Sequence, residues 1–474
     1  MFTHITRLQK LNLASNRLKT ISHTWFYRAS TLIWLNIANN LITMLRDNSF
    51  IDLRNLEHLD LSGNQISSID PVAFEGLHSL KVLNLNRNQL GVIEDNSFAM
   101  LRQLEKLHLA NNVITFLRED TFTGLSSLTL LDMSHNSISD ISYMRSLKAL
   151  PNIESLHLSH NKIQVIKAQT FQNTGKIQVL HLDHNLIEDV EDDAFVVLSV
   201  SSVSRLAWLF LDYNRLSYIR DDVLVGTPFL KYLGVSNNHI QFISDAAFRQ
   251  CPQLITADLA YNELNYLPPS LFHSLPSLVK LDIASNNLSM IQPRLFDGLT
   301  RLMDLNLRNN SISSFQTGTF ERLIEIRQLQ LAQNFLHRID MDFFKEMASL
   351  RYLNLSYNIV ERVEPTRGIP AALDVLDLRY NHLHTISVSM MSSLTQDGKI
   401  YLQGNNWHCS CQLLWLMDER LLQTLRDVDT LHCYSPTYLH GLEKIQRAGM
   451  AAQWAEHYIQ YISSLFLQTD EIGP

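Results

Sequence analysis

The amino-acid sequence predicts an α/β solenoid, a curved horseshoe with a concave parallel β-sheet and a helical cap at its C-terminal end. Three observations predict this fold. The pattern LxxLxLxxNxL starts at Leu8 and recurs about every 24 residues, a phenylalanine recurs on the same period, and three of the four cysteines follow the last coil. We expect an array over residues 1–398 (about sixteen repeats, the first starting mid-repeat), a cysteine cap over 399–450 and a helix over 451–474.

The leucine pattern explains why single coils stack. In xxLxLxx the leucines alternate, so they share one face of a short strand, and a lone strand cannot bury that face. Stacked coils pair the strands in parallel and enclose one continuous core. The asparagine ends the strand, where its amide can satisfy backbone groups of the turn. These asparagines are Asn16, Asn40, Asn64, Asn88, Asn112, Asn136, Asn161, Asn185, Asn214, Asn238, Asn262, Asn286, Asn310, Asn334, Asn358, Asn381 and Asn405.

The phenylalanines form a second register at the same period, which makes chance a poor explanation. We expect them to fill the wider back of the coils and so to curve the stack toward the strands. Leu147 and Leu224 occupy two gaps in the series. Its members are Phe2, Phe26, Phe50, Phe74, Phe98, Phe122, Phe171, Phe195, Phe248, Phe272, Phe296, Phe320 and Phe344.

Composition excludes several classes of protein. The 474 residues are 46% hydrophobic and 18% charged, which is typical of an ordered chain. The net charge of −8 argues against a nucleic-acid partner. No run of 18 apolar residues could span a bilayer, and the first residues do not resemble a signal peptide, so any membrane association would use segments outside this chain.

The repeat resembles the typical leucine-rich repeat of extracellular animal proteins, the family of Slit, Toll receptors, chaoptin and related ectodomains. The resemblance covers roughly residues 2–450. It implies an α/β leucine-rich-repeat solenoid in a receptor, adhesion or matrix protein, an extracellular or cell-surface location, and a protein ligand or receptor as partner. Family members dimerise through either face, so a homodimer is also open.

The cysteine segment resembles the C-terminal cap of the same family. Its matching residues are Asn405, Trp407, Cys409, Cys411, Cys433, Pro436, Gly441 and Leu442. The resemblance implies a Cys409–Cys433 disulfide, and it implies a fourth cysteine as partner of Cys411. The chain has no cysteine there, so Cys411 is a free buried thiol, part of an intermolecular bridge, or a sign of a damaged cap. Cys251 lies far along the array and is expected to be a half-buried free thiol.

The two ends of the chain depart from the family pattern. Phe2 already lies on the phenylalanine register, so we expect either a fragment of a longer secreted protein or another device covering the first coil. Near the other end, a helix with Trp454, Tyr458, Ile462 and Leu465 on one face either packs across the cap or is a partner-binding or juxtamembrane helix.

Residues at the third, fifth, seventh and eighth positions of LxxLxLxxN, here called the concave columns, should point into the concavity. Over repeats 6–11 (residues 128–262) these columns hold aromatic, histidine and aspartate residues and contain no Lys or Arg. Exposed aromatics favour a binding site, although they could also stack on one another. The insertion "LSVSSVS" before Leu206 could overhang this face. The predicted ligand-binding residues are His157, His160, His181, Asp183, His184, Trp208, Phe210, Asp212, Tyr213, Tyr232, Asp258 and Tyr261.

The histidines should form two ladders, because neighbouring strands lie about 4.8 Å apart. His135, His160 and His184 make one, and His157 and His181 make the other. Polar filling, a zinc site and a pH-dependent surface are the alternatives. We assign no metal, and we take the pH-dependent surface as the hypothesis that a change of affinity between about pH 5.5 and 7.5 would test.

The remaining motifs concern modification and catalysis. Asn287, Asn309 and Asn354 begin glycosylation sequons, and the last two fall on concave columns. The sequence shows no nucleophile with a base, no zinc-protease motif and no phosphate-binding glycine loop, so we expect neither an enzyme nor a cofactor. The alternative to an ectodomain is an intracellular leucine-rich-repeat scaffold without disulfides.

Overall fold

The computed structural model describes residues 7–141, 145–197, 204–364, 370–387, 398–408, 424–427, 431 and 433–435. The chain divides into two compact units, Met1–Leu278 and Val279–Pro474. Cys409, Cys411, the side chain of Cys433, the insertion at 198–203, most of the predicted cap and the terminal helix lie outside the described residues. The predicted domain boundaries and the disulfide therefore stay predictions.

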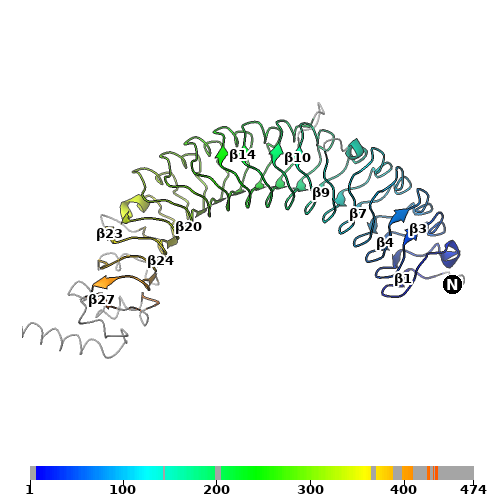
Figure 1. The fold of residues 1–474 in the computed structure, drawn as a ribbon, viewed down its shortest axis with the longest axis horizontal. Coiled ribbons are helices and arrows are strands. Elements are labelled where there is room, and N and C mark those ends of the chain that lie inside the picture. Colours follow the sequence, from blue (N-terminus) through cyan, green and yellow to red (C-terminus); the bar gives the residue numbers. More distant parts are fainter. Residues whose placement is uncertain are drawn as a thin grey trace, which may run out of the picture. The chain divides into compact units, whose positions relative to one another are not determined.

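The first unit is a solenoid whose coils each contribute one three-residue strand to a parallel sheet (Figure 1). Adjacent strands pair in register one repeat apart, as in Leu35 with Leu59. The strands are β1 (Lys10–Asn12), β2 (Trp34–Asn36), β4 (His58–Asp60), β6 (Val82–Asn84), β7 (Lys106–His108), β8 (Leu130–Asp132), β9 (Ser155–His157), β11 (Val179–His181), β13 (Trp208–Phe210), β15 (Tyr232–Gly234) and β17 (Thr256–Asp258).

The second unit repeats this architecture, and its strands also pair in parallel with the same register. They are β18 (Lys280–Asp282), β19 (Asp304–Asn306), β20 (Gln328–Gln330), β22 (Tyr352–Asn354), β24 (Val375–Asp377) and β25 (Lys399–Tyr401).

Shorter elements complete the coils. Two-stranded pairs are formed by β3 (Met44–Leu45) with β5 (Ser68–Ile69), β10 (Val165–Ile166) with β12 (Asp189–Val190), β14 (Tyr218–Ile219) with β16 (Phe242–Ile243), β21 (Arg338–Asp340) with β23 (Arg362–Glu364), and β26 (Trp407–His408) with β27 (Cys433–Ser435). Helical structure within the described ranges is limited to the 3₁₀ turns η1 (His23–Phe26), η2 (Arg145–Ala149) and η3 (Met341–Phe344). Nothing helical in those ranges has the length and apolar character that a bilayer crossing requires.

The core is the predicted leucine and phenylalanine ladder. Leu83, Leu107 and Leu131 on successive strands are fully buried, and the back of most of the described coils is filled by a buried phenylalanine such as Phe74 or Phe98. Cys251 is a free thiol as expected, but it is fully buried, not half-buried, because it lies between coils against Thr227 Oγ1 at 3.4 Å. Burial raises the pKa of Cys251 to about 11.

Ring spacings report the curvature of the first unit. On the sheet side the His135 and His160 rings are 4.0 Å apart, whereas on the back the Phe74 and Phe98 rings are 5.9 Å apart. A stack that is spaced more widely at the back than at the sheet must bend toward the sheet. In this unit β4, β7 and β9 accordingly lie on the inner side of the ribbon, and β3, β10 and β14 on its outer side (Figure 1).

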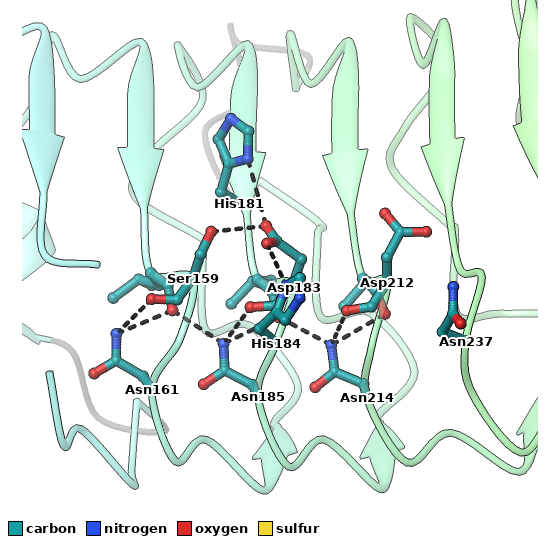
Figure 2. A network of polar contacts seen from close by, with 12 residues as sticks. Ser159, Asn161, His181, Asp183, His184, Asn185, Asp212, Asn214 and Asn237 are labelled. Atoms are coloured by element: carbon teal, nitrogen blue, oxygen red, sulfur yellow. Dashed lines mark hydrogen bonds and ion pairs between the residues drawn. The ribbon is translucent and has the colours of Figure 1, made fainter. Parts of the chain in front are cut away.

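The recurrent asparagines join neighbouring coils. The Asn161 Nδ2 donates to Leu158 O in its own coil at 3.0 Å and to Met133 O in the preceding coil at 3.0 Å, and its Oδ1 accepts from Ile138 N at 3.0 Å. Asn185 and Asn214 make equivalent bonds (Figure 2). The sequence predicted an amide that satisfies its own turn, and the bonds to the preceding coil are an addition from the structure.

The residue before each asparagine is left-handed. His135, His160, His184, Tyr213 and Tyr261 have φ between 52° and 55°. Asparagine, aspartate and histidine tolerate this conformation better than bulky residues do. The strained backbone turns these side chains out of the strand direction and onto the open face.

We predict that Asn112→Ala destabilises the protein by about 3 kcal/mol, because it leaves the Leu90 amide and the Leu85 and Leu109 carbonyls without their partner. Urea denaturation measures the loss, and hydrogen exchange should show faster exchange of the Leu90 amide. The matched control is Asn111→Gly in the same turn, where an exposed residue at φ 56° is replaced by one that favours that φ. Equal destabilisation by the two variants would contradict the prediction.

Candidate functional site on the sheet of the first unit

None of the twelve predicted ligand-binding residues is buried. His160, His184, Trp208, Tyr213 and Tyr261 are exposed, and the other seven are half-buried. The interleaved leucines, by contrast, are fully buried, as Leu156, Leu180 and Leu209 illustrate. The concave columns of β8 to β17 therefore form one accessible face of the first unit. We call this surface the ring face.

The first ladder on the ring face is longer than predicted. His157 and His181 have ring centroids 4.5 Å apart, and His181 stacks on Phe210 at 4.3 Å with an interplanar angle of 2°. Phe210 then contacts Tyr232 at 4.8 Å. Tyr232 belongs to a different concave column from the other three residues, so the ladder changes column in its last step.

Gly234 accounts for that change of column. It lies beside Phe210 in the register of the sheet and has no side chain to stack. A Cβ added at Gly234 would lie 2.3 Å from Asp212 Oδ2, so the carboxylate of Asp212 occupies the space that a side chain would need. Burial raises the pKa of Asp212, although its Oδ1 accepts from Ser236 N and Oγ, each at 2.8 Å. Burial and neighbouring aspartates also raise the pKa of Tyr232 to about 12, which keeps its hydroxyl protonated.

The second ladder consists of the left-handed residues. The rings of His135 and His160 are 4.0 Å apart, His160 and His184 are 4.1 Å apart, and His184 and Tyr213 are 4.3 Å apart. All three pairs are stacked with interplanar angles of 22° or less. The sequence predicted the histidine part of this ladder, and Tyr213 extends it.

Asp183 lies between the two ladders and contacts both (Figure 2). Its Oδ1 accepts from Ser159 Oγ at 2.7 Å and lies 3.5 Å from His181 Nδ1, and its Oδ2 lies 3.0 Å from His184 Nδ1. Burial acts to raise the pKa of Asp183, but these three contacts outweigh it and hold the pKa well below its usual range. Asp183 is therefore a fixed negative charge among the imidazoles.

Two of the ladder histidines, His157 and His160, favour the neutral form. Burial lowers the pKa of His157, and the neighbouring His181 lowers it further. Burial and the flanking His135 and His184 likewise lower the pKa of His160. These two rings become protonated only at a lower pH than a free histidine does. Whether binding to the ring face changes with pH stays a hypothesis.

The structure adds a serine–histidine contact that the sequence did not identify. Ser155 Oγ and His157 Nε2 lie 2.8 Å apart. Hydrolytic use of such a pair needs backbone amides directed at an oxyanion, but the amides of Ser155 and Leu158 donate to Thr129 O and His181 O in the adjacent coils. This contact therefore orders the ring of His157 in the ladder.

Three predicted residues flank the ladders. Trp208 is 37% exposed at the edge of the ring face, and the Lys231 ammonium lies 5.9 Å from its ring centroid. Tyr261, the most exposed of the predicted aromatics at 60%, lies two coils beyond Tyr213. Asp258 Oδ1 accepts from Ala260 N at 3.1 Å and ends the strand locally.

The second unit carries a smaller aromatic group that was not among the predicted site residues. Tyr357 and Tyr380 stack at 4.5 Å, and the Arg379 guanidinium lies 4.9 Å from the Tyr401 ring centroid. Arg379 is held by the buried Asp377, with Nη2–Oδ2 at 2.6 Å. Because the carboxylate of Asp377 neutralises this guanidinium, Arg379 would attract an anionic ligand only weakly.

The sequons differ in their side-chain contacts. Asn287 and Asn309 are exposed and Asn354 is half-buried, but Asn309 Nδ2 donates to Ser285 Oγ at 3.0 Å and Asn354 Nδ2 donates to Gln330 Oε1 at 3.0 Å. A glycan at either of the last two would have to replace a hydrogen bond between coils. Asn287 is therefore the predicted acceptor at which a glycan would disturb the fold least.

The leucine rich repeat family pattern matches residues 6–66, 63–114, 102–153, 151–216, 228–288, 276–335 and 324–367. The matches span well over half of the sequence, and the chain belongs to the leucine rich repeat family. No curated protein matches the chain in sequence.

Solved structures show the same fold. Toll of Drosophila, in its complex with Spatzle, is 21% identical with a TM-score of 0.78 over 91% of this chain and 62% of Toll. An LRR protein of Leptospira interrogans is 22% identical with a TM-score of 0.58, covering 89% of this chain and 90% of that protein. The leucine-rich repeat domain of APL1B is 22% identical with a TM-score of 0.50 over 73% of this chain and 86% of that domain. The present chain thus spans less than two thirds of the Toll chain.

Asp132, at the end of β8, belongs to the ring face, and the contribution of its carboxylate to the stability of the fold should depend on pH. Burial acts to raise its pKa, but contact with His108 (Nδ1–Oδ2 3.9 Å) and hydrogen bonds from Ser134 N at 3.0 Å and Oγ at 2.7 Å lower it to about 2. A carboxyl group whose pKa is lower in the folded state stabilises the fold above its unfolded pKa. That stability is lost as the pH falls from about 4 to about 2.

We therefore expect Asp132→Asn to lower the free energy of unfolding by about 2 kcal/mol at pH 7 and to have almost no effect near pH 2. Urea denaturation at a series of pH values measures the difference. Asp47→Asn, at an exposed carboxylate, controls for the change in net charge. A difference between wild type and Asp132→Asn that does not depend on pH would refute the assignment.

Proposed function

We propose that this chain is a protein-binding ectodomain, or part of one, of a cell-surface or secreted protein, and that its partner docks on the ring face. The observation that carries the proposal is the pair of adjacent ring ladders, which present aromatic and imidazole rings to solvent in one continuous array. Aromatic side chains dominate the energetics of protein interfaces, and a buried leucine core does not require these rings to be on the surface.

Stacking prepares the ring face for binding. A free tyrosine or histidine side chain loses rotational freedom when a partner covers it, and this loss opposes binding. Rings already stacked at 4.0–4.3 Å have lost part of that freedom on folding. The ring face therefore resembles a preorganised interface, whose affinity per contact is higher than that of mobile side chains.

Charge indicates the chemistry of the partner. Asp132, Asp183, Asp212 and Asp258 all lie on the concave columns of repeats 6–11, and no Lys or Arg occupies these columns. Like charges across an interface are costly, and opposite charges accelerate association. A partner with a basic surface that also offers aromatic or apolar side chains fits this face best.

The similarity to Toll supports a protein partner. The Toll structure is that of a complex with Spatzle, and the two chains share a fold along most of the present chain. The fold alone does not specify a ligand, since one scaffold carries many binding sites. The rings of repeats 6–11 are the feature that distinguishes this proposal from the general properties of the family. They also favour binding over catalysis.

We predict that Trp208→Ala and Tyr213→Ala each weaken partner binding about 30-fold, the effect of losing a contact worth about 2 kcal/mol. Both rings are substantially exposed, so their removal should leave the fold intact. The control is Phe242→Ala, a 53% exposed ring in the β14–β16 pair and not on the ring face.

The measurement uses the wild type and the three variants as immobilised baits for proteins of the native extracellular fluid, followed by binding kinetics with the recovered partner. The proposal expects the partner on the wild-type and Phe242→Ala baits only. Equal recovery on all four baits, or loss on the Phe242→Ala bait alone, would place binding elsewhere.

Mass spectrometry without reduction tests the extracellular location. We predict a Cys409–Cys433 linkage and a glycan on Asn287 in protein purified from its natural source. An intracellular scaffold, the alternative, would have free thiols at both cysteines and no glycan. Finding both thiols free would overturn the extracellular part of the proposal and leave the ring face to be tested separately.

A further inference from the structure

The residues around Asp183 combine imidazole and carboxylate ligands in one small volume. One ligand atom from each of His160, Asp183 and His184 lies within 4.8 Å of the other two. His160 comes from one coil, and the other two residues come from the next. Their backbones are fixed by the sheet and by the asparagine bonds to Leu158 O and Leu182 O.

We propose that His160, Asp183 and His184 form a binding site for a zinc ion. Two imidazole nitrogens and one carboxylate oxygen are a donor set that zinc accepts, with bond lengths of about 2.0–2.2 Å and an open position for water or another ligand. Imidazole ligands disfavour magnesium and calcium, which select oxygen ligands.

The geometry requires a small adjustment. Ligand atoms around a tetrahedral zinc are about 3.4 Å apart for bonds of this length. Atoms that lie within 4.8 Å of one another therefore have to approach by at most about 1.4 Å. The His184 side chain is 39% exposed, and His160 is exposed, so rotation of the two rings out of the stack supplies this movement without disturbing the core.

The groups that would orient the carboxylate ligand are already in position. Ser159 Oγ donates to Asp183 Oδ1 at 2.7 Å, and His181 Nδ1 lies 3.5 Å from the same oxygen (Figure 2). Oδ2 is thereby turned toward His184, at 3.0 Å. Partners of this kind fix the orientation of metal ligands and are worth about 10–100-fold in affinity.

Calorimetric titration of the full chain with zinc chloride tests the proposal. We expect one zinc ion per chain, at least about 100-fold weaker binding in His160→Gln and His184→Gln, and about 10-fold weaker binding in Ser159→Ala. Magnesium chloride should not compete. The control is His239→Ala, since His239 is exposed and pairs with Glu263 away from Asp183. No binding to the wild type, or equal binding by the His160→Gln and His184→Gln variants, would overturn the site.

A footprint on the wild-type chain keeps the test independent of how the variants fold. Diethyl pyrocarbonate modifies accessible imidazoles, and peptide mass spectrometry locates the products. Zinc should protect His160 and His184 and leave His239 as reactive as before. Equal protection of all three histidines would indicate adventitious binding, and no protection would exclude the site. Neither result bears on the proposed protein partner, which the bait experiment tests with other variants, Trp208→Ala and Tyr213→Ala.

Discussion

The rest of the structure depends on the in-register stacking of coils, held by asparagine side chains that bond across the boundary between them. Asn161 illustrates the device, since one side chain amide bonds to carbonyls of two coils and accepts an amide proton from the preceding coil. With the register fixed, the neighbour of any side chain is the residue at the same position one repeat away. The chemistry of the surface is therefore set by the residues that follow one another along a column, one repeat apart, and not by residues adjacent in the sequence.

This constraint decides which residues can follow one another in a column. Rings gain by stacking at the strand spacing, as His160 does between His135 and His184. Carboxylates at the same spacing repel, and burial together with the neighbouring Asp183 raises the pKa of Asp212. Serines occupy the same column on either side of this pair, and each donates a hydrogen bond to one of the aspartates: Ser159 to Asp183 and Ser236 to Asp212. The column tolerates two adjacent negative charges because each has its own hydroxyl donor.

The period alone was sufficient to predict the leucine core, the phenylalanine back and the two histidine ladders, because each of these follows from register. What it could not predict depends on side-chain direction. The ladder changes column at Tyr232 because Gly234 has no side chain and the carboxylate of Asp212 occupies that space. The contact between Ser155 and His157 depends on the rotamers of the two side chains. When the repeats are aligned by their period, Gly234 interrupts a run of rings in its column, and this interruption could have indicated the change of column.

Stacked rings and a metal site make different demands on the same histidines. A flat partner surface packs best on His160 and His184 when the two rings are stacked 4.1 Å apart. A zinc ion instead needs both rings turned so that their nitrogens converge near Asp183. A ligand that binds one arrangement better than the other shifts the population between them. Zinc and a partner that touches these two rings are then coupled, and by linkage each must change the affinity of the other by the same factor. A partner that contacts only the Trp208 and Phe210 end of the ring face would be free of this coupling.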